Sequence, residues 1–388
     1  MSALRDTYAI TDSIQYRLRA AGALLGVSDN TLRGYSDTSG LEIRRASEIN
    51  PDSPAVRVFD IATLFKMAAW RRAQGLSKAL GGAGPLTIAV DVIKGGTGKS
   101  TTTVELGLHL ALMGMRVLLI DLDPQANLTQ MMGYEADLTL QEAPEYKLTS
   151  AAIVTGTFAS VMIPFIERQR GTLRLREPDS VDFIKRPFGD AGPALIPADT
   201  FIGDLEQAIG SAKGHRELFF RQMIEASLAG QVPGLDVKQF DVILFDCPPS
   251  ISFCSTNALA AADIVVSPIK LDSFSVKGLT KLMSELQGLD STYHIRPELI
   301  ILPTHYAPNL ARIGRMQSQL TIYKQYLAPS AISASEEFPK SLDAYLPLSL
   351  QKPTVNAAKE YRVFSEYVLS RLHKIVQERS KCFNPRPD

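Results

Sequence analysis

Short apolar runs rich in Val, Ile and Leu recur along the chain from Leu86 onward, and helix-like segments separate them. The runs cover residues 86–92, 116–123, 240–246, 263–269 and 298–304, and none alternates apolar with polar positions. Strands that are buried on both faces have this composition, because helices cover both faces of a parallel sheet. We therefore predict an α/β fold with a mostly parallel, doubly wound sheet over residues 86–388.

Residues 1–80 have a different pattern, in which apolar positions follow helical spacing. Leu18, Ala21, Leu24 and Leu25 share one face of a helix. A turn at 26–28 follows, and Ser28 is a suitable N-cap for a second helix. A helix, a short glycine turn and a second helix form the plan of a helix-turn-helix motif.

The remainder of this region completes the prediction of a small, mainly helical module. The stretch "GVSDNTLRGY" resembles the MerR-like winged form of this motif, which implies a β-wing at 41–60, and 61–74 read as a further amphipathic helix. The glycines and proline within 80–85 break helical structure, so we predict a linker there. The expected domains are thus a winged helix-turn-helix module at 1–80 and an α/β domain at 86–388.

The overall composition excludes several classes of protein. Lys and Arg together number 41, as do Asp and Glu, so nucleic-acid binding must rely on local patches. No apolar run approaches the ~18 residues that span a bilayer, and the N-terminus lacks the apolar core of a secretory signal. Three scattered cysteines do not make a disulfide framework. These features predict a cytoplasmic protein.

The stretch "DVIKGGTGKSTTT", residues 91–103, almost matches a phosphate-binding loop. The usual pattern is a glycine, four residues, then Gly-Lys-Ser/Thr, but Ile93 stands where the first glycine belongs. A glycine loop between a strand and a helix points backbone N–H groups at phosphate oxygens. In such a loop Lys99 contacts the β- and γ-phosphates, and the Ser100 hydroxyl binds Mg²⁺. The second lysine, Lys94, has no place in the usual pattern.

Two acidic motifs follow later strands. "LLIDLDPQAN" places Asp121 and Asp123 at the carboxyl end of one strand, the edge where parallel α/β sheets bind ligands. "VILFDCPPS" ends an apolar strand in Asp246, the arrangement that holds Mg²⁺ in many nucleotide hydrolases. Carboxylates at these positions suit a magnesium ion and an attacking water molecule.

Together these motifs resemble those of the ParA/MinD family of ATPases. "KGGTGKST" is similar to the deviant Walker A box, "DLDPQAN" to the second acidic motif, and "DCPPS" to the Walker B and switch loop. The resemblance implies that Lys94 reaches the phosphates of a partner subunit across an ATP-bound homodimer. It also implies that Asp123 positions the hydrolytic water and that Lys94, Lys99 and Asp123 are the catalytic residues.

The same resemblance implies the cofactors ATP/ADP and Mg²⁺. The residues that it assigns to the nucleotide are Lys94, Gly95, Gly96, Thr97, Gly98, Lys99, Ser100, Thr101, Asp121, Asp246 and Asn309, and those that it assigns to the metal are Ser100, Asp121 and Asp246. Asn309 lies in a loop that approaches adenine in relatives, and an ordinary connecting loop is the alternative. Ile93 departs from the family pattern but sides with the ParA branch, which often lacks the first glycine.

DNA contacts are predicted in two places. Residues 1–80 contain eleven basic and eight acidic residues, and 340–388 contain nine and five, so both excesses are modest. The candidates are Asn30, Thr31, Arg33, Arg44 and Arg45 in the first region and Lys340, Lys352 and Arg362 in the second. The alternatives are a helical dimerisation region that does not contact DNA and an ordinary solvated surface.

The pairing of the two domains resembles the larger plasmid-partition ParA proteins. It implies an ATP-dependent dimer on non-specific nucleoid DNA, a ParB-type centromere-binding partner that stimulates hydrolysis, and operator binding by the N-terminal module. We expect the amphipathic helix near the C-terminus to dock on its own domain rather than on a membrane. A MinD-like membrane ATPase and a nucleotide-responsive transcriptional regulator remain alternatives.

Overall fold

The computed structural model describes residues 4–11, 13–81, 84–169, 183–270, 273–306 and 321–383. A six-stranded sheet with the order β5-β4-β6-β3-β7-β8 forms its centre, and each neighbouring pair is parallel. The strands are β3 (Leu86–Val90), β4 (Val117–Asp121), β5 (Ala194–Ile196), β6 (Val242–Asp246), β7 (Ile264–Lys270) and β8 (Glu298–Thr304). The predicted fold class is confirmed. Only β5 was not predicted, because three residues carry too little pattern.

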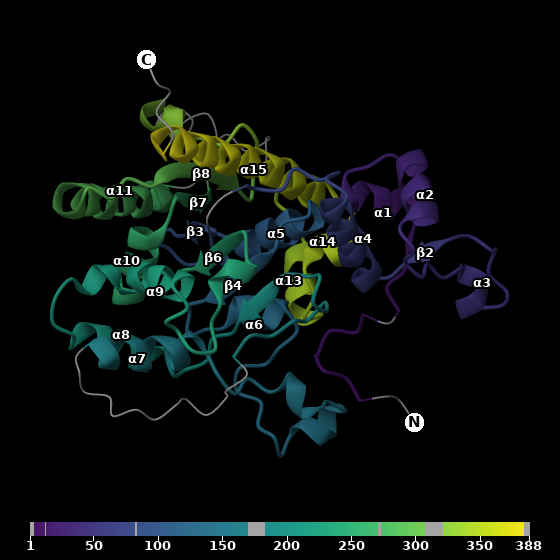
Figure 1. Ribbon diagram of the computed structural model, residues 1–388, viewed down its shortest axis with the longest axis horizontal. Helices are drawn as coiled ribbons and strands as arrows, with labels where there is room; N and C mark the ends of the chain where they lie inside the picture. The colour runs from purple at the N-terminus through teal and green to yellow at the C-terminus, as the bar shows by residue number, and fades with distance from the viewer. Residues whose placement is uncertain are drawn as a thin grey trace.

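Helices cover both faces of this sheet (Figure 1). One hydrophobic cluster joins the sheet to α5 (Lys99–Leu112), α14 (Leu348–Gln351) and α15 (Asn356–Phe383). A second cluster joins the opposite face to α7–α11. Their bounds are α7 (Phe158–Gln169), α8 (Ile202–Gly210), α9 (Phe219–Leu228), α10 (Phe253–Ala261) and α11 (Ser273–Tyr293). Side chains of successive strand residues alternate between the two clusters, as Ile88 and Ala89 do.

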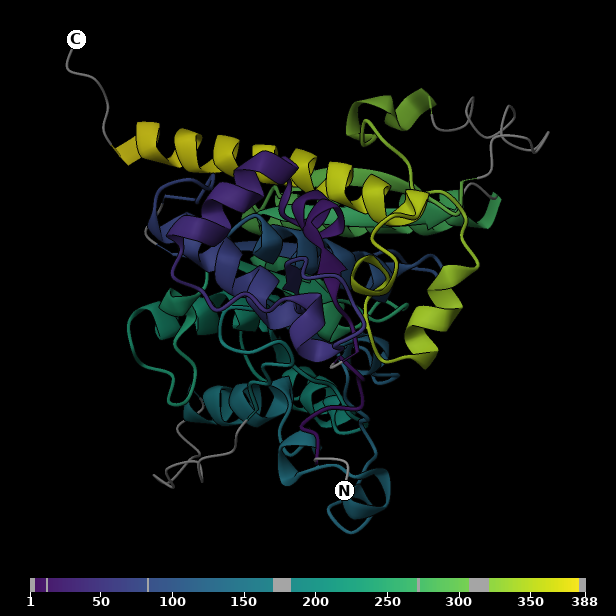
Figure 2. The same cartoon turned by 90° about the vertical axis from the view of Figure 1, so that its right-hand side faces the viewer.

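The long helix α15 packs on the domain to which it belongs. Its buried side chains include Tyr361, Phe364, Val368 and Leu372, and they belong to the same cluster as α5. In Figure 2 the helix lies along the top of the molecule, with the N-terminal helices against it. The expectation that this helix docks on its own domain is therefore confirmed. Within the described residues, no helix combines the length and the apolar character needed to cross a membrane.

The N-terminal region contains the predicted pair of helices. Its elements are β1 (Tyr16–Arg17), α1 (Leu18–Leu25), α2 (Asp29–Thr38), α3 (Ala46–Ile49), β2 (Val58–Phe59) and α4 (Ile61–Ala73). The Ser28 hydroxyl accepts a hydrogen bond from the Thr31 N–H, so the predicted N-cap is present. Strand β2 pairs antiparallel with β1, and Arg57 forms an antiparallel bridge with Arg45 on its other side. A small antiparallel arrangement thus occupies the stretch in which we expected a wing.

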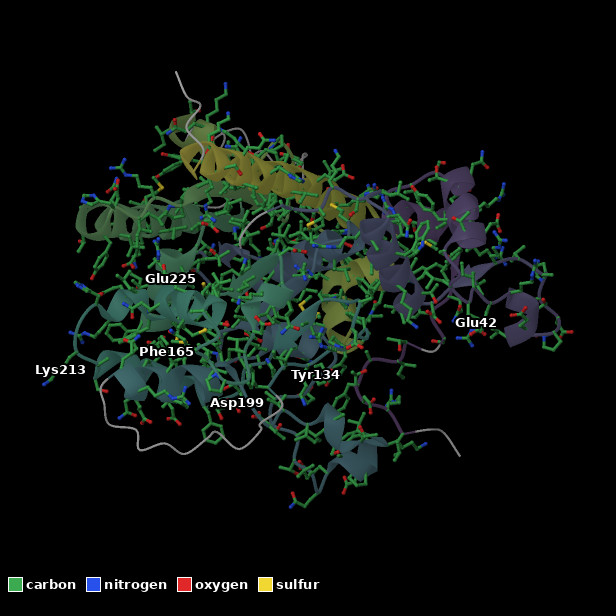
Figure 3. The ribbon with its side chains drawn as sticks, in the orientation of Figure 1. Glu42, Tyr134, Phe165, Asp199, Lys213 and Glu225 are labelled. Atoms are coloured by element: carbon green, nitrogen blue, oxygen red, sulfur yellow. The ribbon has the colours of Figure 1, made fainter. Side chains whose placement is uncertain are left out.

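This region is packed tightly against the α/β unit rather than held on a free linker. Leu24 and Leu64 belong to the same hydrophobic cluster as the sheet and α5. Arg72 Nη2 lies 3.0 Å from Asp241 Oδ1, and Arg116 Nη2 lies 2.9 Å from the same oxygen. Figure 3 shows Glu42 of the N-terminal region and Lys213 after α8 at opposite ends of the molecule. The N-terminal region therefore forms one end of a structure with a shared core.

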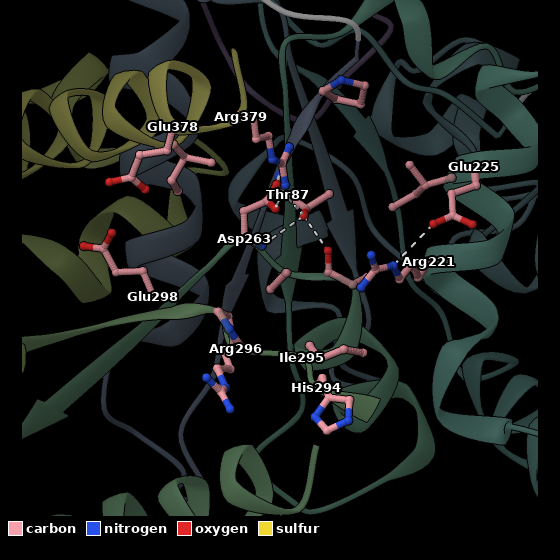
Figure 4. Close-up of a pocket in the computed structure, with 16 residues that line it drawn as sticks. Thr87, Arg221, Glu225, Asp263, His294, Ile295, Arg296, Glu298, Glu378 and Arg379 are labelled. Atoms are coloured by element: carbon pink, nitrogen blue, oxygen red, sulfur yellow. Dashed lines mark hydrogen bonds and ion pairs between the residues drawn. The ribbon is translucent and has the colours of Figure 1, made fainter. Parts of the chain in front are cut away.

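A polar cavity of about 540 Å³ lies at the amino ends of the strands, opposite the phosphate loop (Figure 4). Asp263 accepts hydrogen bonds from the Thr87 N–H and from Arg379. Arg221 pairs with Glu225 at 3.3 Å on the neighbouring wall. These charged groups pair with one another within the protein. We therefore interpret this cavity as part of the packing contact between β3, β7 and α15.

Candidate functional site

The loop after β3 has the geometry of an anion cradle. Gly96 has a φ of 68° and Gly98 a φ of 88°, which are left-handed conformations that favour glycine. Gly98 is also the N-cap of α5, so the unpaired N–H groups and the positive dipole end of a fourteen-residue helix face the loop. Strand, loop and helix follow one another as the motif requires.

Lys99 lies across this loop, and only 7% of its surface is exposed. Its Nζ donates a hydrogen bond to the Lys94 carbonyl at 3.1 Å. The loop is fixed from behind, because the Thr304 hydroxyl at the end of β8 donates to the Thr97 carbonyl at 2.8 Å. The Ile93 carbonyl lies against Gly278 of α11, where an added Cβ would stand 3.0 Å from its oxygen.

Asp246 lies beneath the loop, fully buried at the end of β6. Its Oδ1 accepts a hydrogen bond from the Thr103 hydroxyl at 3.1 Å, and Oδ2 has no hydrogen-bond partner among the described residues. Burial raises the pKa of Asp246, against an opposing hydrogen bond from Ser100. An orphaned carboxylate oxygen beside a serine hydroxyl is the oxygen donor set that Mg²⁺ prefers. These residues therefore fit a magnesium ion.

Asp121 is the register partner of Asp246 on the adjacent strand β4. Its Oδ1 accepts from the Asp123 N–H at 3.1 Å, and its Oδ2 accepts from the Thr129 N–H and hydroxyl at 2.9 and 2.7 Å. Burial, together with the like charge of Asp246, raises the pKa of Asp121 well above its ordinary value. The contacts show Asp121 holding the start of the next helix, with both oxygens already engaged.

Asp123 reaches the open side of the site. Its Oδ1 accepts the Gln125 N–H at 3.0 Å, and it lines a cavity of about 1060 Å³ beside the phosphate loop. Gly95, Gly96, Gly98, Lys99, Ser100 and Thr101 line the same cavity. The sequence analysis therefore predicted most of the phosphate-loop residues that line this cavity. Asn309 lies outside the described residues.

The opposite walls of the cavity come from α6 (Asn127–Met131), from His305 after β8, and from α13 (Glu337–Asp343), which contributes Phe338 and Leu342. His305 belongs to the loop that we considered for adenine, whereas neither helix was predicted to lie here. Burial and the nearby charge of Lys270 lower the pKa of His305 to about 4, so its imidazole is neutral near pH 7. No sequence motif marks α13, because its place at the site depends on tertiary packing alone.

The predicted DNA contacts of the N-terminal region lie on or near α2. Asn30 and Arg33 are exposed on this helix, and their side chains are 3.3 Å apart. The Thr31 hydroxyl lies 2.8 Å from that of Ser28, within the helix cap. Arg44 pairs with Asp60 at 3.2 Å, and Arg45 donates to the Ala55 carbonyl at 2.9 Å.

Two of the three C-terminal candidates have other partners. Arg362 is hydrogen-bonded to the Ala23 carbonyl at the end of α1, and it pairs with Glu366 at 3.1 Å. It thus joins α15 to the N-terminal region, and its contact with DNA stays a prediction. Lys340 pairs with Glu337 at 2.7 Å and lines the cavity described above. Lys352 alone of the three is exposed without such a role.

Comparison with known proteins agrees with this site. A family model described as an AAA domain matches residues 86–301, which contain the phosphate loop and both acidic motifs. The sporulation initiation inhibitor protein Soj of Bacillus subtilis is 31% identical over 55% of this chain and 69% of its own length. The chromosome partitioning protein ParA of Caulobacter vibrioides is 30% identical over 56% and 68%. The chain belongs to the ParA/Soj family of partitioning ATPases.

A solved structure shares the fold of this ParA/Soj-family protein. Cobyrinic acid a,c-diamide synthase of Mycobacterium smegmatis, with a bound ATP analogue and magnesium, superimposes with a TM-score of 0.54. The two are 23% identical, and the match covers 74% of this chain and 95% of the synthase. At this identity the likeness shows the α/β fold and nothing more specific. The family model begins at Leu86, so residues 1–85 lie outside it.

Proposed function

We propose that this chain binds and slowly hydrolyses Mg-ATP to drive the partitioning of DNA. The observation that carries the proposal is the convergence of three strand ends on one cavity. The phosphate loop follows β3, Asp123 follows β4 and Pro249 follows β6, and all three line the cavity, while Asp246 lies buried beneath the loop at the end of β6. The cavity is large enough for a nucleotide. The synthase of the same fold binds an ATP analogue and magnesium.

Each residue has a distinct task in this proposal. Lys99 leaves the Lys94 carbonyl and contacts the β- and γ-phosphates, while the loop N–H groups hold the remaining oxygens. Ser100 and Asp246 hold the magnesium ion, which when bound neutralises charge on the phosphate oxygens. Asp123 orients the attacking water, because its carboxylate lines the cavity at the edge of the loop. Asp121 supports Asp123 by accepting its N–H.

We further propose that Lys94 acts on the ATP of a second subunit. Gly95 and Gly96 line the cavity of their own chain, whereas Lys94 is not among its lining residues. In the proposed dimer, the Lys94 ammonium is delivered to the phosphates of the facing subunit rather than to its own site. Delivery of this charge from a partner makes ATP a component of a homodimer interface and stabilises the transferring phosphoryl group.

The DNA-related part of the proposal rests on the N-terminal region. Helix α2 exposes Asn30 and Arg33 at one end of the molecule, as a recognition helix requires. The antiparallel bridge between Arg45 and Arg57 lies where a wing would contact phosphates. We propose that this winged helix-turn-helix module binds operator DNA. The ATP-bound dimer then binds non-specific nucleoid DNA, and a ParB-type partner stimulates hydrolysis.

The enzymatic part is tested with ATPase assays of the wild type, Asp123→Ala and Lys94→Ala, with and without DNA and the ParB-type protein. We expect Asp123→Ala to bind ATP and lose hydrolysis, because the water is no longer oriented. Lys94→Ala should lose both hydrolysis and ATP-dependent dimerisation in analytical ultracentrifugation. Unchanged partner-stimulated turnover in Asp123→Ala would overturn the catalytic assignment. Tight ATP binding with no hydrolysis in the wild type would instead favour a nucleotide-responsive regulator.

Operator binding is tested separately by footprinting the upstream region of the gene with ADP and with ATP. Arg33→Ala should weaken protection, and Lys66→Ala is a matched control because Lys66 is an exposed cation on α4. Equal protection by Arg33→Ala and the wild type would remove α2 as the recognition helix.

A further inference from the structure

The N-terminal arm, residues 4–9, reaches past the N-terminal helices to the lobe formed by residues 134–153 (Figures 1 and 2). On its way it contacts the end of α6. The Tyr8 N–H donates to the Gly133 carbonyl at 2.8 Å, and Gly133 lies two residues after α6. Gly133 has a φ of 95°, and a Cβ there would lie 3.2 Å from the Thr7 Cβ. The arm is therefore packed closely on the end of this helix.

The same arm contacts the end of α13. The Tyr8 and Tyr345 rings are stacked, with centroids 4.8 Å apart and an angle of 18° between planes. Tyr345 lies two residues after α13, and its hydroxyl is hydrogen-bonded to Glu135. Through its backbone N–H and its ring, Tyr8 thus joins the ends of two helices that are far apart in sequence.

The outer part of the arm is anchored to the 134–153 lobe. The Arg5 N–H donates to the Lys147 carbonyl at 3.0 Å, and the Thr149 N–H donates to the Arg5 carbonyl at 2.9 Å. The Thr149 hydroxyl lies 2.6 Å from Asp6 Oδ1. Because the arm is anchored at Arg5, Asp6 and the Tyr8 N–H, the Tyr8 ring has a fixed position.

We propose that Tyr8 and Tyr345 are positioning residues for the nucleotide. Helices α6 and α13 contribute Met131 and Phe338 to the cavity wall, and the arm fixes their separation by its contacts just after each helix, at Gly133 and Tyr345. Loss of the arm allows these walls to part and shortens the residence time of the nucleotide, while the phosphate loop is unchanged. The arm continues into β1, so a rearrangement of the N-terminal region reaches the nucleotide cavity through it. This inference rests on the proposed ATP site.

The test measures release of a fluorescent ATP analogue from the full-length protein after mixing with excess ATP. An aromatic pair contributes about 0.5–1.5 kcal/mol, which corresponds to a two- to roughly tenfold change in rate. We expect Tyr8→Ala and Tyr345→Ala to release the analogue faster by this factor. Tyr8→Phe should match the wild type, because it keeps the ring. Ile10→Ala is the control, since Ile10 is 63% exposed beside the arm.

Two further measurements separate this inference from the proposed function. Lys99→Ala should abolish binding of the analogue, and a wild type that does not bind it would refute the proposed ATP site itself. Hydrogen exchange should show faster exchange in α6 and α13 for Tyr8→Ala and not for Tyr8→Phe. If the wild type binds and Tyr8→Ala releases the analogue at the wild-type rate, the positioning role is wrong. Equal acceleration in Tyr8→Phe would also contradict it.

Discussion

Glu105→Gln is expected to stabilise this protein at alkaline pH and to change little at acidic pH. Glu105 is fully buried on α5, where its Oε1 accepts the Ser349 N–H at 3.2 Å. Its Oε2 has no hydrogen-bond partner among the described residues. His109 Nε2 lies 4.0 Å from Oε2, and burial lowers the pKa of His109 to about 3, so His109 carries no charge. Ionised Glu105 therefore has no positive partner in this contact.

The magnitude follows from the two protonation states. Burial raises the pKa of Glu105 from an ordinary 4.5 to about 7. A raised pKa means that the folded state binds the proton more tightly, so the stabilisation is complete below pH 4.5 and is lost as pH rises through 7. The full loss is about 3 kcal/mol, at about 1.4 kcal/mol per pKa unit. Between pH 5 and pH 8 the free energy of unfolding of the wild type should therefore fall by about 2–3 kcal/mol. The Glu105→Gln variant should not show this fall, because glutamine does not ionise.

The assay is urea unfolding of the wild type and Glu105→Gln at pH 5 and pH 8, without nucleotide. The quantity compared is the free energy of unfolding of the variant minus that of the wild type. We expect this difference to be about 2–3 kcal/mol more favourable to the variant at pH 8 than at pH 5. His109 titrates in both proteins and cancels in this comparison. Glu145→Gln is the control, because it makes the same substitution at an exposed position. An equal difference for Glu105→Gln at both pH values would refute the reasoning.

Three other substitutions test the packing around the site. Gly278→Ala places a Cβ 3.0 Å from the Ile93 carbonyl oxygen and should weaken ATP binding severalfold in calorimetry. The control is Gly288→Ala on the same helix, where the added Cβ has no neighbour within 4 Å and ATP binding should be normal. Although burial alone would raise the pKa of Asp241, hydrogen bonds from two arginines lower it, so its stabilisation is present above about pH 4 and is lost as pH falls through the lowered pKa of the folded state. Asp241→Asn should therefore cost about 1–3 kcal/mol in urea unfolding at pH 7, and this cost should shrink as pH falls below about 4; a cost that stays constant at acidic pH would contradict this. Gly107→Ala places a Cβ 2.5 Å from a leucine side chain of β4, which should reduce the free energy of unfolding by about 1–3 kcal/mol and lower the thermal midpoint. An unchanged midpoint would show that the leucine moves aside without loss of stability.

Local patterns were sufficient to predict the phosphate-binding half of the site. The order of residues from Lys94 to Ser100 specifies a glycine loop that enters a helix, and the structure has left-handed backbone at Gly96 and Gly98. The acids at the ends of β4 and β6 could be placed near this loop, because parallel strands end at one edge of a sheet. The N-cap at Ser28 was also predictable, since it depends only on the residues beside it.

The other half of the site depends on contacts that sequence does not encode locally. Arg362 was considered only as a DNA contact, and the local sequence did not indicate that it joins α15 to the end of α1. Asp121 and Asp123 look equivalent in "DLDPQAN", but the fold directs the first toward Thr129 and the second toward the cavity. Helix α13 joins the cavity wall only because the chain returns from the far edge of the sheet.

By itself, then, the sequence determined the α/β class, the phosphate loop and the chemistry of its acids. Each of these depends on short-range pattern, because strand burial, glycine conformations and capping act within a few residues. Only the tertiary structure decided which charges face solvent, how the N-terminal region is packed, and which helices close the nucleotide cavity. The arm at residues 4–9 shows the reason, since its partners at Gly133 and Tyr345 are distant along the chain and are brought to it by packing of the whole domain.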